Sequence, residues 1–391
     1  MRAPRHDHSP DDHAPDDHAP DDRTNRDRTR RDERAVGRWL ATFAVLIVAI
    51  VLVGGATRLT ESGLSITEWK PVSGVVPPLG EAAWQAEFEK YQRIPQYERL
   101  NAGMTLAGFR AIYLWEYGHR LLARLVGLAF VLPLGWFALR GRLPRRARRP
   151  VGALLLLLMV QAAMGWWMVR SGLSVRTEVS QYRLALHLVS ALAILALTTW
   201  TAAELLEPRR AAASRAGRRR ARALDALLAL VVLTAGSGAL VAGLRAGRIF
   251  NTFPLMGGRV VPPGYGQLSP WWRNPFENHA AVQFDHRVLA TTTFLLAVAL
   301  WAAFRGAPDH RFATRMHLVL GAALLQVVLG IATLLLAVPV ALGVAHQGGA
   351  ALLMIAVLLA RHATGEVLAP ARSADIAGAA DLGPPLSRRA G

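Results

Sequence analysis

Four histidines occur in the apolar part of this 391-residue chain, and their spacing indicates a metal centre. They are His119, His187, His286 and His346, each near the start of a long apolar stretch. An ionisable side chain is expensive inside a bilayer, so it is a functional hypothesis by default. One such histidine is equally explained by a hydrogen bond to a neighbouring helix. Four histidines at one depth in the membrane favour metal ligation, because two facing imidazoles suit the two axial positions of a haem iron.

Zinc fits these histidines less well than haem iron does. Zinc takes four N, O or S ligands, whereas each half of the chain offers two histidines and the chain has no cysteine. The lack of cysteine also excludes a disulfide, a thiolate-ligated haem and an iron–sulfur cluster.

Glu116 distinguishes the first half of the chain from the second. It stands three residues before His119 on the same face of a helix, whereas the residue at the corresponding place before His286 is Gln283. A carboxylate beside a haem can transfer protons or orient a bound oxygen species. If the halves divide the work, the first performs chemistry and the second holds a fixed cofactor.

Four arginines near the membrane boundary at which the histidines lie are candidates to neutralise the propionates of a haem. They are Arg58, Arg120, Arg124 and Arg287. Arginines at a membrane boundary are also ordinary anchors, so both interpretations stay open. Arg120 and Arg124 offer a structural alternative for Glu116, because an acidic residue pairs with a basic one that follows it by one or two helical turns.

The composition places these residues in a membrane protein. Hydrophobic residues make up 52% of the chain and charged residues 18%, against about 25% charged residues in a soluble protein. Apolar blocks of about 20 residues are long enough to cross a bilayer. This pattern excludes a conventional soluble enzyme and an outer-membrane barrel, whose strands alternate over short segments. The net charge of +18 comes from arginine clusters between the apolar blocks, which indicates topology rather than nucleic-acid binding.

Eight apolar segments are predicted to span the membrane. We place them at 38–57, 111–139, 151–169, 182–203, 224–244, 286–304, 316–338 and 342–361. Arginine clusters precede the first segment and follow the second, fourth and sixth, so all the clusters lie on one side of the membrane. The positive-inside rule then puts both termini in the cytoplasm and the loops 58–110 and 245–285 outside. We expect a bacterial inner membrane, with the four histidines near its outer face.

The chain contains an internal duplication, in which EYGHRLLARLVG at 116–127 corresponds to QFDHRVLATTTF at 283–294. Further matches are Gln161 with Gln326, Gly165 with Gly330, and His187 with His346. Each repeat has an even number of spans, so both enter the membrane in the same sense and are related by an axis along the membrane normal. The predicted fold is an all-α integral membrane protein, with eight transmembrane helices in two tandem four-helix bundles related by a pseudo-two-fold axis.

These patterns divide the chain into five parts. The first and last have no apolar face to bury, so we expect disordered cytoplasmic tails at 1–36 and 363–391. The first bundle covers 37–207 and the second 223–362, joined by a basic cytoplasmic linker at 208–222.

Several motifs resemble the haem A synthase family. They are GGATRLTESGLSITEWKPVSGVVPPL (54–79), EYGHR (116–120), NTFPLMGG (251–258), NPFENHAAVQFDHR (274–287) and AHQGGA around His346. The resemblance extends from about residue 38 to residue 362 and indicates the cysteine-free subgroup of proteobacteria and mitochondria. The N-terminal tail, the linker and His279 have no counterpart in it, and we expect His279 in a loop.

The resemblance implies an oxidoreductase that oxidises the C8 methyl group of haem O to a formyl group, through hydroxylated intermediates, giving haem A for terminal oxidases. It implies a resident haem b in the second bundle, on the pair matching His286 and His346. The substrate haem O belongs to the first bundle. The candidate catalytic residues are Glu116, His119 and His187, and the candidate cofactor-binding residues are His286, His346, Arg287 and Arg120.

Other functions remain compatible with the residues alone. A bis-histidine b-type cytochrome would hold two permanent haems and only carry electrons, but it needs neither the difference between Glu116 and Gln283 nor the motif at 54–79. A transporter built from parallel repeats would have broken helices at mid-membrane, whereas Pro133 is the clear internal proline here. The expected partners are haem O synthase, cytochrome oxidase assembly factors, an electron donor or acceptor, and membrane lipid, but no nucleic acid. Homo-oligomerisation stays open.

Overall fold

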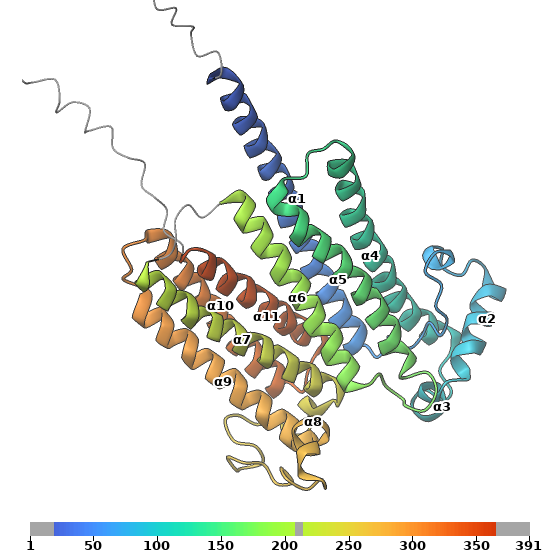
Figure 1. Ribbon diagram of the computed structural model, residues 1–391. Helices are drawn as coiled ribbons and strands as arrows, with labels where there is room; N and C mark the ends of the chain where they lie inside the picture. The colour runs from blue at the N-terminus through green and yellow to red at the C-terminus, as the bar shows by residue number, and fades with distance from the viewer. Residues whose placement is uncertain (1–18, 208–213, 365–391) are drawn as a thin grey trace, which may run out of the picture.

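The fold is built from long α-helices, as the apolar blocks predict (Figure 1). The computed structural model describes residues 19–207 and 214–364. Its long helices are α1 (Ala19–Leu59), α4 (Leu106–Leu139), α5 (Arg145–Arg170), α6 (Gln181–Leu206), α7 (Arg215–Gly243), α9 (His279–Phe304), α10 (His310–Leu335) and α11 (Val340–His362). All eight are long and apolar enough to cross a membrane, which confirms the predicted number of spans.

Shorter helices lie in the two long connections at one end of the bundle (Figure 1). The connection from α1 to α4 contains η1 (Ser73–Val75), α2 (Glu81–Gln92) and α3 (Pro95–Leu100), and the connection from α7 to α9 contains η2 (Ala246–Arg248), η3 (Trp271–Arg273) and α8 (Asn274–Glu277). We call this end, made by 60–105 and 244–278, the loop end. α2 packs on α4 through a second apolar cluster that includes the fully buried Tyr91 and Phe109.

Corresponding helix pairs pack together in the two halves of the chain. α1 contacts α4 and α6, as α7 contacts α9 and α11. α5 packs on α6 as α10 packs on α11. The halves meet where α6 lies against α7 and α1 against α11, so these four helices form the centre (Figure 1). A tandem duplication requires such pairings, while the axis that relates the halves stays a prediction.

The main apolar core runs along this central contact, where Leu40 of α1 and Leu195 of α6 are fully buried. Large apolar side chains also remain exposed on the outside of the bundle, among them Leu132, Leu156 and Leu295. A soluble protein rarely leaves so much apolar surface in water. These faces fit contact with lipid.

Helix α1 begins inside the segment that was predicted to be a disordered tail. Its first residue is Ala19, so the prediction of disorder is wrong for residues 19–36. The charged stretch has a partner in the connection from α4 to α5: Asp32 Oδ1 accepts a hydrogen bond from Nε of Arg142 at 2.7 Å. The pattern of charges along the segment, taken without that contact, indicated a solvated chain.

Other helices also begin earlier than predicted. α7 begins at Arg215, inside the predicted linker, and α9 begins at His279, so the prediction of a loop at this residue is wrong. Asn278 caps α9, because its side-chain oxygen accepts hydrogen bonds from the backbone N–H groups of Ala280 and Ala281 at 2.9 and 3.3 Å. The predicted tail segments 1–18 and 365–391 and the linker residues 208–213 lie outside the described residues.

Candidate functional site

The four candidate histidines lie on four helices that all start at the loop end. His187, His286 and His346 come six or seven residues after the first residue of their helices, about 9–10 Å along the axis. α4 starts earlier than predicted and packs its first turns against α2, so His119 lies about 20 Å from its start. Each of the four side chains keeps part of its surface accessible, so none is sealed in the packed core.

His286 and His346 face each other in the second half. Their ring centroids are 6.5 Å apart and their planes are perpendicular, at 90°. A shared metal would lie about 2 Å from one nitrogen of each ring, as in other imidazole complexes, and this separation accommodates one metal atom.

Ser237 on α7 lies within hydrogen-bond distance of the His286 ring. The serine Oγ donates a hydrogen bond to the carbonyl oxygen of Thr234 at 2.8 Å and lies 2.9 Å from Nδ1 of His286. With its only hydrogen on the carbonyl, the serine is able to accept a bond from an Nδ1–H group. In that tautomer the Nε2 atom of His286 is unprotonated, which is the form that binds a metal.

His119 on α4 and His187 on α6 are the corresponding histidines of the first half, and each lies against a glycine of a neighbouring helix. Gln161 on α5 donates to the backbone carbonyl of His187 at 3.1 Å and lies 3.4 Å from its ring Nε2. Val53 occupies in α1 the place that Ser237 has in α7, one residue before a glycine that faces a histidine. Valine has no hydroxyl group, so the first half has no counterpart of the serine bond.

This donor set fits a haem better than a zinc ion. Within residues 19–207 and 214–364, no group of three or more His, Asp or Glu side chains could hold a metal ion. In the same part of the chain, Nδ1 of His187 and Nδ1 of His346 are among the buried polar atoms without a hydrogen-bond partner, which leaves both nitrogens open to a ligand. All four imidazole rings lie against glycines of neighbouring helices. Because glycine has no side chain, each ring lies close to the backbone of the neighbouring helix.

Glu116 is buried, with 2% of its surface exposed, and its carboxylate accepts four hydrogen bonds. Oε2 accepts from Ser65 Oγ and from the backbone N–H of Ile66, both at 2.8 Å. Oε1 accepts from Nε and Nη2 of Arg120 at 3.0 and 2.6 Å. Each bond is accepted and none is donated, the pattern of a carboxylate rather than a carboxylic acid. The ion pair considered from the sequence is therefore present, and Arg120 rather than Arg124 makes it.

Arg120 also binds the backbone of the loop that contains Ser65 and Ile66, and so holds this loop against α4. It donates to the carbonyl oxygens of Ile66 at 2.8 Å and Glu68 at 3.0 Å. The ion pair and these two bonds together hold residues 65–68 against the helix that carries His119.

The second half has the same arrangement without the negative charge. Arg287 donates to the carbonyl oxygens of Phe250 at 2.7 Å and Thr252 at 2.8 Å. Gln283 donates to the Phe250 carbonyl at 3.1 Å. The loop at 250–252 is thus tied to α9 as its counterpart is tied to α4, but by a neutral amide and one arginine.

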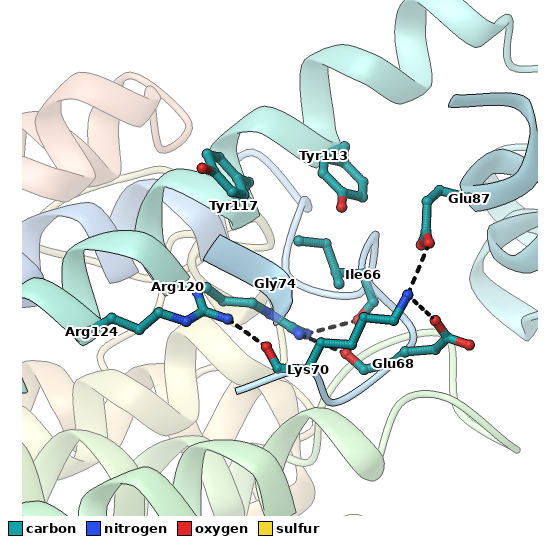
Figure 2. A pocket seen from close by; sticks show the side chains of 9 residues that line it. All are labelled: Ile66, Glu68, Lys70, Gly74, Glu87, Tyr113, Tyr117, Arg120 and Arg124. Carbon is teal, nitrogen blue, oxygen red and sulfur yellow. Dashed lines mark hydrogen bonds and ion pairs between the residues drawn. The ribbon is translucent and has the colours of Figure 1, made fainter. Parts of the chain in front are cut away.

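A pocket opens at the loop end beside this network, and Figure 2 shows the side chains around it. It is lined by Ile66, Glu68, Lys70, Gly74, Glu87, Tyr113, Tyr117, Arg120 and Arg124. Lys70 pairs with Glu68 at 2.5 Å and with Glu87 at 3.3 Å, and Lys90 pairs with the same two carboxylates at 2.9 Å. The hydrogen bonds from the two lysines lower the pKa of Glu68 below its usual range. Arg124 donates to the Lys70 carbonyl at 2.7 Å.

Arg58, the remaining candidate arginine, joins the two halves. It forms an ion pair with Glu178 at 2.7 Å and donates to the carbonyl oxygen of Ala242 at 2.8 Å. Arg245, which follows α7, pairs with Glu178 and also with Glu61 at 3.0 Å. Three connections at the loop end meet in this network.

Sequence reasoning did not identify Ser237 and Ser65 as site residues, although each makes a hydrogen bond to one of them. Ser237 lies in the triplet Gly236–Gly238 inside an apolar span, and a hydroxyl between two glycines was the available signal. Ser65 is in a loop, and no pattern along the chain relates it to Glu116.

The fold and these sites define an all-α, multi-pass membrane protein that carries two tandem pairs of intramembrane histidines suited to haem. The chain belongs to the cytochrome oxidase assembly protein family, whose model matches residues 37–358. Among its relatives is the heme A synthase of Rhodopseudomonas palustris (strain BisB5), 51% identical over 336 residues, which are 85% of this chain and 91% of the relative.

Two further relatives cover similar shares. The heme A synthase of Sinorhizobium medicae is 50% identical over 321 residues, which are 81% of this chain and 86% of the relative. That of Nitrosospira multiformis is 45% identical over 334 residues, which are 84% of this chain and 93% of the relative. The family resemblance seen in the motifs is confirmed.

Proposed function

We propose that this chain is a haem A synthase, an oxidoreductase that converts haem O to haem A. The reaction oxidises the C8 methyl group of the substrate to a formyl group by successive hydroxylation and loss of water. One observation carries the proposal: both halves of the chain contain a pair of intramembrane histidines. The chain is also about half identical, over 85% of its length, to relatives that are named for this activity.

The second half is the site of the resident haem b in this proposal. His286 and His346 would hold it, since their rings stand 6.5 Å apart and Ser237 is placed to accept a bond from Nδ1–H of His286, which leaves Nε2 free. A haem held in this way supplies electron transfer. The neutral amide of Gln283 and the cationic Arg287 hold the neighbouring loop, and this half has no carboxylate at the place of Glu116.

The first half is the site of the substrate haem O. His119 and His187 correspond to the resident pair, but the helix beside His119 has a valine where the other half has Ser237. A weaker hold on the ligand suits a site that must admit haem O and release haem A.

Glu116 acts beside the substrate, three residues before His119 on α4. Its carboxylate receives four hydrogen bonds, so it enters the reaction as fixed negative charge and as the anchor of residues 65–68. Fixed charges that need no rearrangement during a reaction are effective in stabilising developing charge. Arg120 keeps this charge in place.

The arginine clusters support an orientation in the inner membrane with both termini in the cytoplasm. The loop end, and with it the histidines, would then lie toward the outer face. The partners in this proposal are haem O synthase, which supplies the substrate, cytochrome oxidase assembly factors, and an electron donor or acceptor.

The test is a haem extraction from a host that makes haem O but no haem A. Membrane haems are separated by chromatography and identified by mass, with Glu116→Ala beside the wild-type chain. Haem A or its hydroxylated precursor in the wild type, and its loss in the variant with haem b retained, support the proposal. Haem b alone, at two per chain, would instead identify a bis-histidine electron carrier, which the geometry of His286 and His346 also suits.

A further inference from the structure

Each of the four histidines lies against one glycine of a neighbouring helix. A Cβ atom built on these glycines would lie 3.2 Å from His119 Nε2 at Gly54, 3.2 Å from His187 Cε1 at Gly165, 3.0 Å from His286 Cε1 at Gly238 and 2.8 Å from His346 Cε1 at Gly330. In every case the nearest atoms belong to the imidazole and to no other side chain.

The same pairing occurs in both halves. In the first half, α1 supplies the glycine for the histidine of α4, and α5 supplies the glycine for the histidine of α6. In the second half, α7 and α10 do the same for α9 and α11. These are corresponding helices of the duplication, so the contact between glycine and imidazole is part of the repeated site.

Other glycines of the same helices make no such contact. Gly152 on α5 and Gly321 on α10 have nothing within 4 Å of an added Cβ, and Gly236 on α7 meets only Val189 at 3.4 Å. Some glycines of these helices approach other side chains closely, as Gly55 does Gln347 at 2.6 Å, so the four positions are distinguished by the imidazole that each one meets.

We propose that Gly54, Gly165, Gly238 and Gly330 are positioning residues that set the place of the four imidazoles for iron ligation. A carbon atom prefers about 3.5–4.0 Å from its neighbours, so a methyl group at these places pushes the ring. Metal sites tolerate errors of only about 0.2 Å in ligand distance. The imidazole is rigid and escapes only by turning about its side-chain torsions, which moves its nitrogen away from the iron.

The contact distances rank the four positions. Gly330 is the tightest, at 2.8 Å, and Gly238 follows at 3.0 Å, whereas the two first-half glycines leave 3.2 Å. The pair that we assign to the resident haem therefore has less free space than the pair that we assign to the substrate. The inference rests on the proposed function, because the iron belongs to the haems named there.

The experiment compares Gly330→Ala and Gly238→Ala with Gly321→Ala and Gly236→Ala in the purified full-length protein. Haem b content per chain, the absorption spectrum and the electron paramagnetic resonance spectrum of the ferric haem report on ligation without any turnover. Alanine is the better helix former, so loss of helix does not explain a defect, and circular dichroism checks this.

We expect the control variants to keep the low-spin spectrum and the haem content of the wild type. Gly330→Ala should retain haem b about 10-fold more weakly, the size of effect seen when residues behind a metal ligand are changed, and should show high-spin iron. Gly238→Ala should show a smaller effect in the same direction. Unchanged spectra in Gly330→Ala, or equal losses in Gly321→Ala, would overturn the proposal.

The first half is tested in the same way with Gly165→Ala and its control on the same helix, Gly152→Ala. The expected result is weaker binding of added haem O in Gly165→Ala, seen as a smaller shift of the haem spectrum, while haem b in the second half is unchanged. If Gly165→Ala binds haem O as well as Gly152→Ala does, the proposed role of glycine is wrong for the first half. A wild-type chain that contains no haem at all would instead refute the proposed function.

Discussion

Arg120 and Arg287 make the same pair of hydrogen bonds in the two halves of the chain. Each guanidinium donates to two carbonyl oxygens that lie two residues apart, on Ile66 and Glu68 in one half and on Phe250 and Thr252 in the other. The planar fork of arginine can bridge two acceptors in this way. The halves thus share their scaffold and differ in the residue one turn earlier on the helix.

Glu116→Gln changes that residue to the type found in the second half. The amide removes the negative charge opposite Arg120, whose side chain is 17% exposed, and leaves this cation without its charged partner. We expect formation of haem A to fall about 100-fold, within the range for loss of a positioned acid–base or charged group, with haem b content unchanged. Extracted haems measure both quantities. Glu98→Gln, at an exposed position of α3, is the control, and wild-type product yield in Glu116→Gln would exclude a role for the charge.

Arg120→Lys and Arg287→Lys test the shared scaffold. An ammonium group keeps the charge but cannot bridge two carbonyls as the guanidinium does. We expect faster proteolysis of 60–105 in the first variant and of 244–278 in the second. Arg140→Lys, at an exposed position, should be cleaved at the wild-type rate. We expect each arginine to hold only its own loop. Faster cleavage of both loops in either single variant would contradict this expectation.

Ser237→Ala removes the hydroxyl group that lies 2.9 Å from Nδ1 of His286. The ring then lacks its fixed orientation, and we expect haem b retention to fall about 10-fold. Titration of the purified protein with haem measures the affinity. Ser237→Thr keeps the hydroxyl and should restore most of it, while Thr292→Ala on an exposed face of α9 should change nothing. Full affinity in Ser237→Ala would mean that other contacts orient the ring.

Glu178→Gln breaks the network that joins the halves at the loop end. Arg58 loses its charged partner and Arg245 keeps only Glu61, and hydrogen bonds to charged groups contribute about 1.5–3 kcal/mol. Because the side chain of Glu178 is 21% exposed, we expect a loss of about 1–2 kcal/mol in the free energy of unfolding. Thermal denaturation in detergent measures it, with the exposed Glu81→Gln as control. A midpoint equal to that of the control would mean that the network adds no net stability.

The charges around Glu68 predict acid sensitivity of the loop at 60–105. Lys70 and Lys90 lower the pKa of this carboxyl in the folded protein, so its contribution is complete above the unfolded value and is lost as the pH falls through the folded value. Proteolysis of the loop should therefore accelerate as the pH falls below about 4.5, the ordinary value of the group. Glu68→Gln should show much less of this acceleration. An identical pH profile in the variant would assign the effect to another carboxylate.

The eight spans and the histidines could be predicted from the sequence because both signals are local. A membrane span requires a long apolar run, and an ionisable residue within that run stands out. The charged start of α1 could not be predicted to be helical, because its support comes from Asp32 meeting Arg142 on a distant segment.

The partners of the site residues could not be read from spacing alone. The sequence left Glu116 with chemistry or an ion pair as alternatives, and the structure adds Ser65 and Ile66, which lie about fifty residues earlier in a loop. Gly165 and Gly330 were visible only as matches in the duplication, and Gly54 and Gly238 were not singled out by the sequence. Their role depends on how closely two helices approach, which packing decides.

The contact between α1 and α11 also sets an order of assembly during synthesis. Gln347 on α11 donates to the carbonyl oxygen of Val51 on α1 at 2.7 Å, across 296 residues of chain. The first helix to leave the ribosome must therefore wait in the bilayer for the last before this bond can form. Insertion can proceed span by span, but the centre of the protein closes only when translation is almost complete, so a nascent chain that stops short of α11 lacks both this bond and His346.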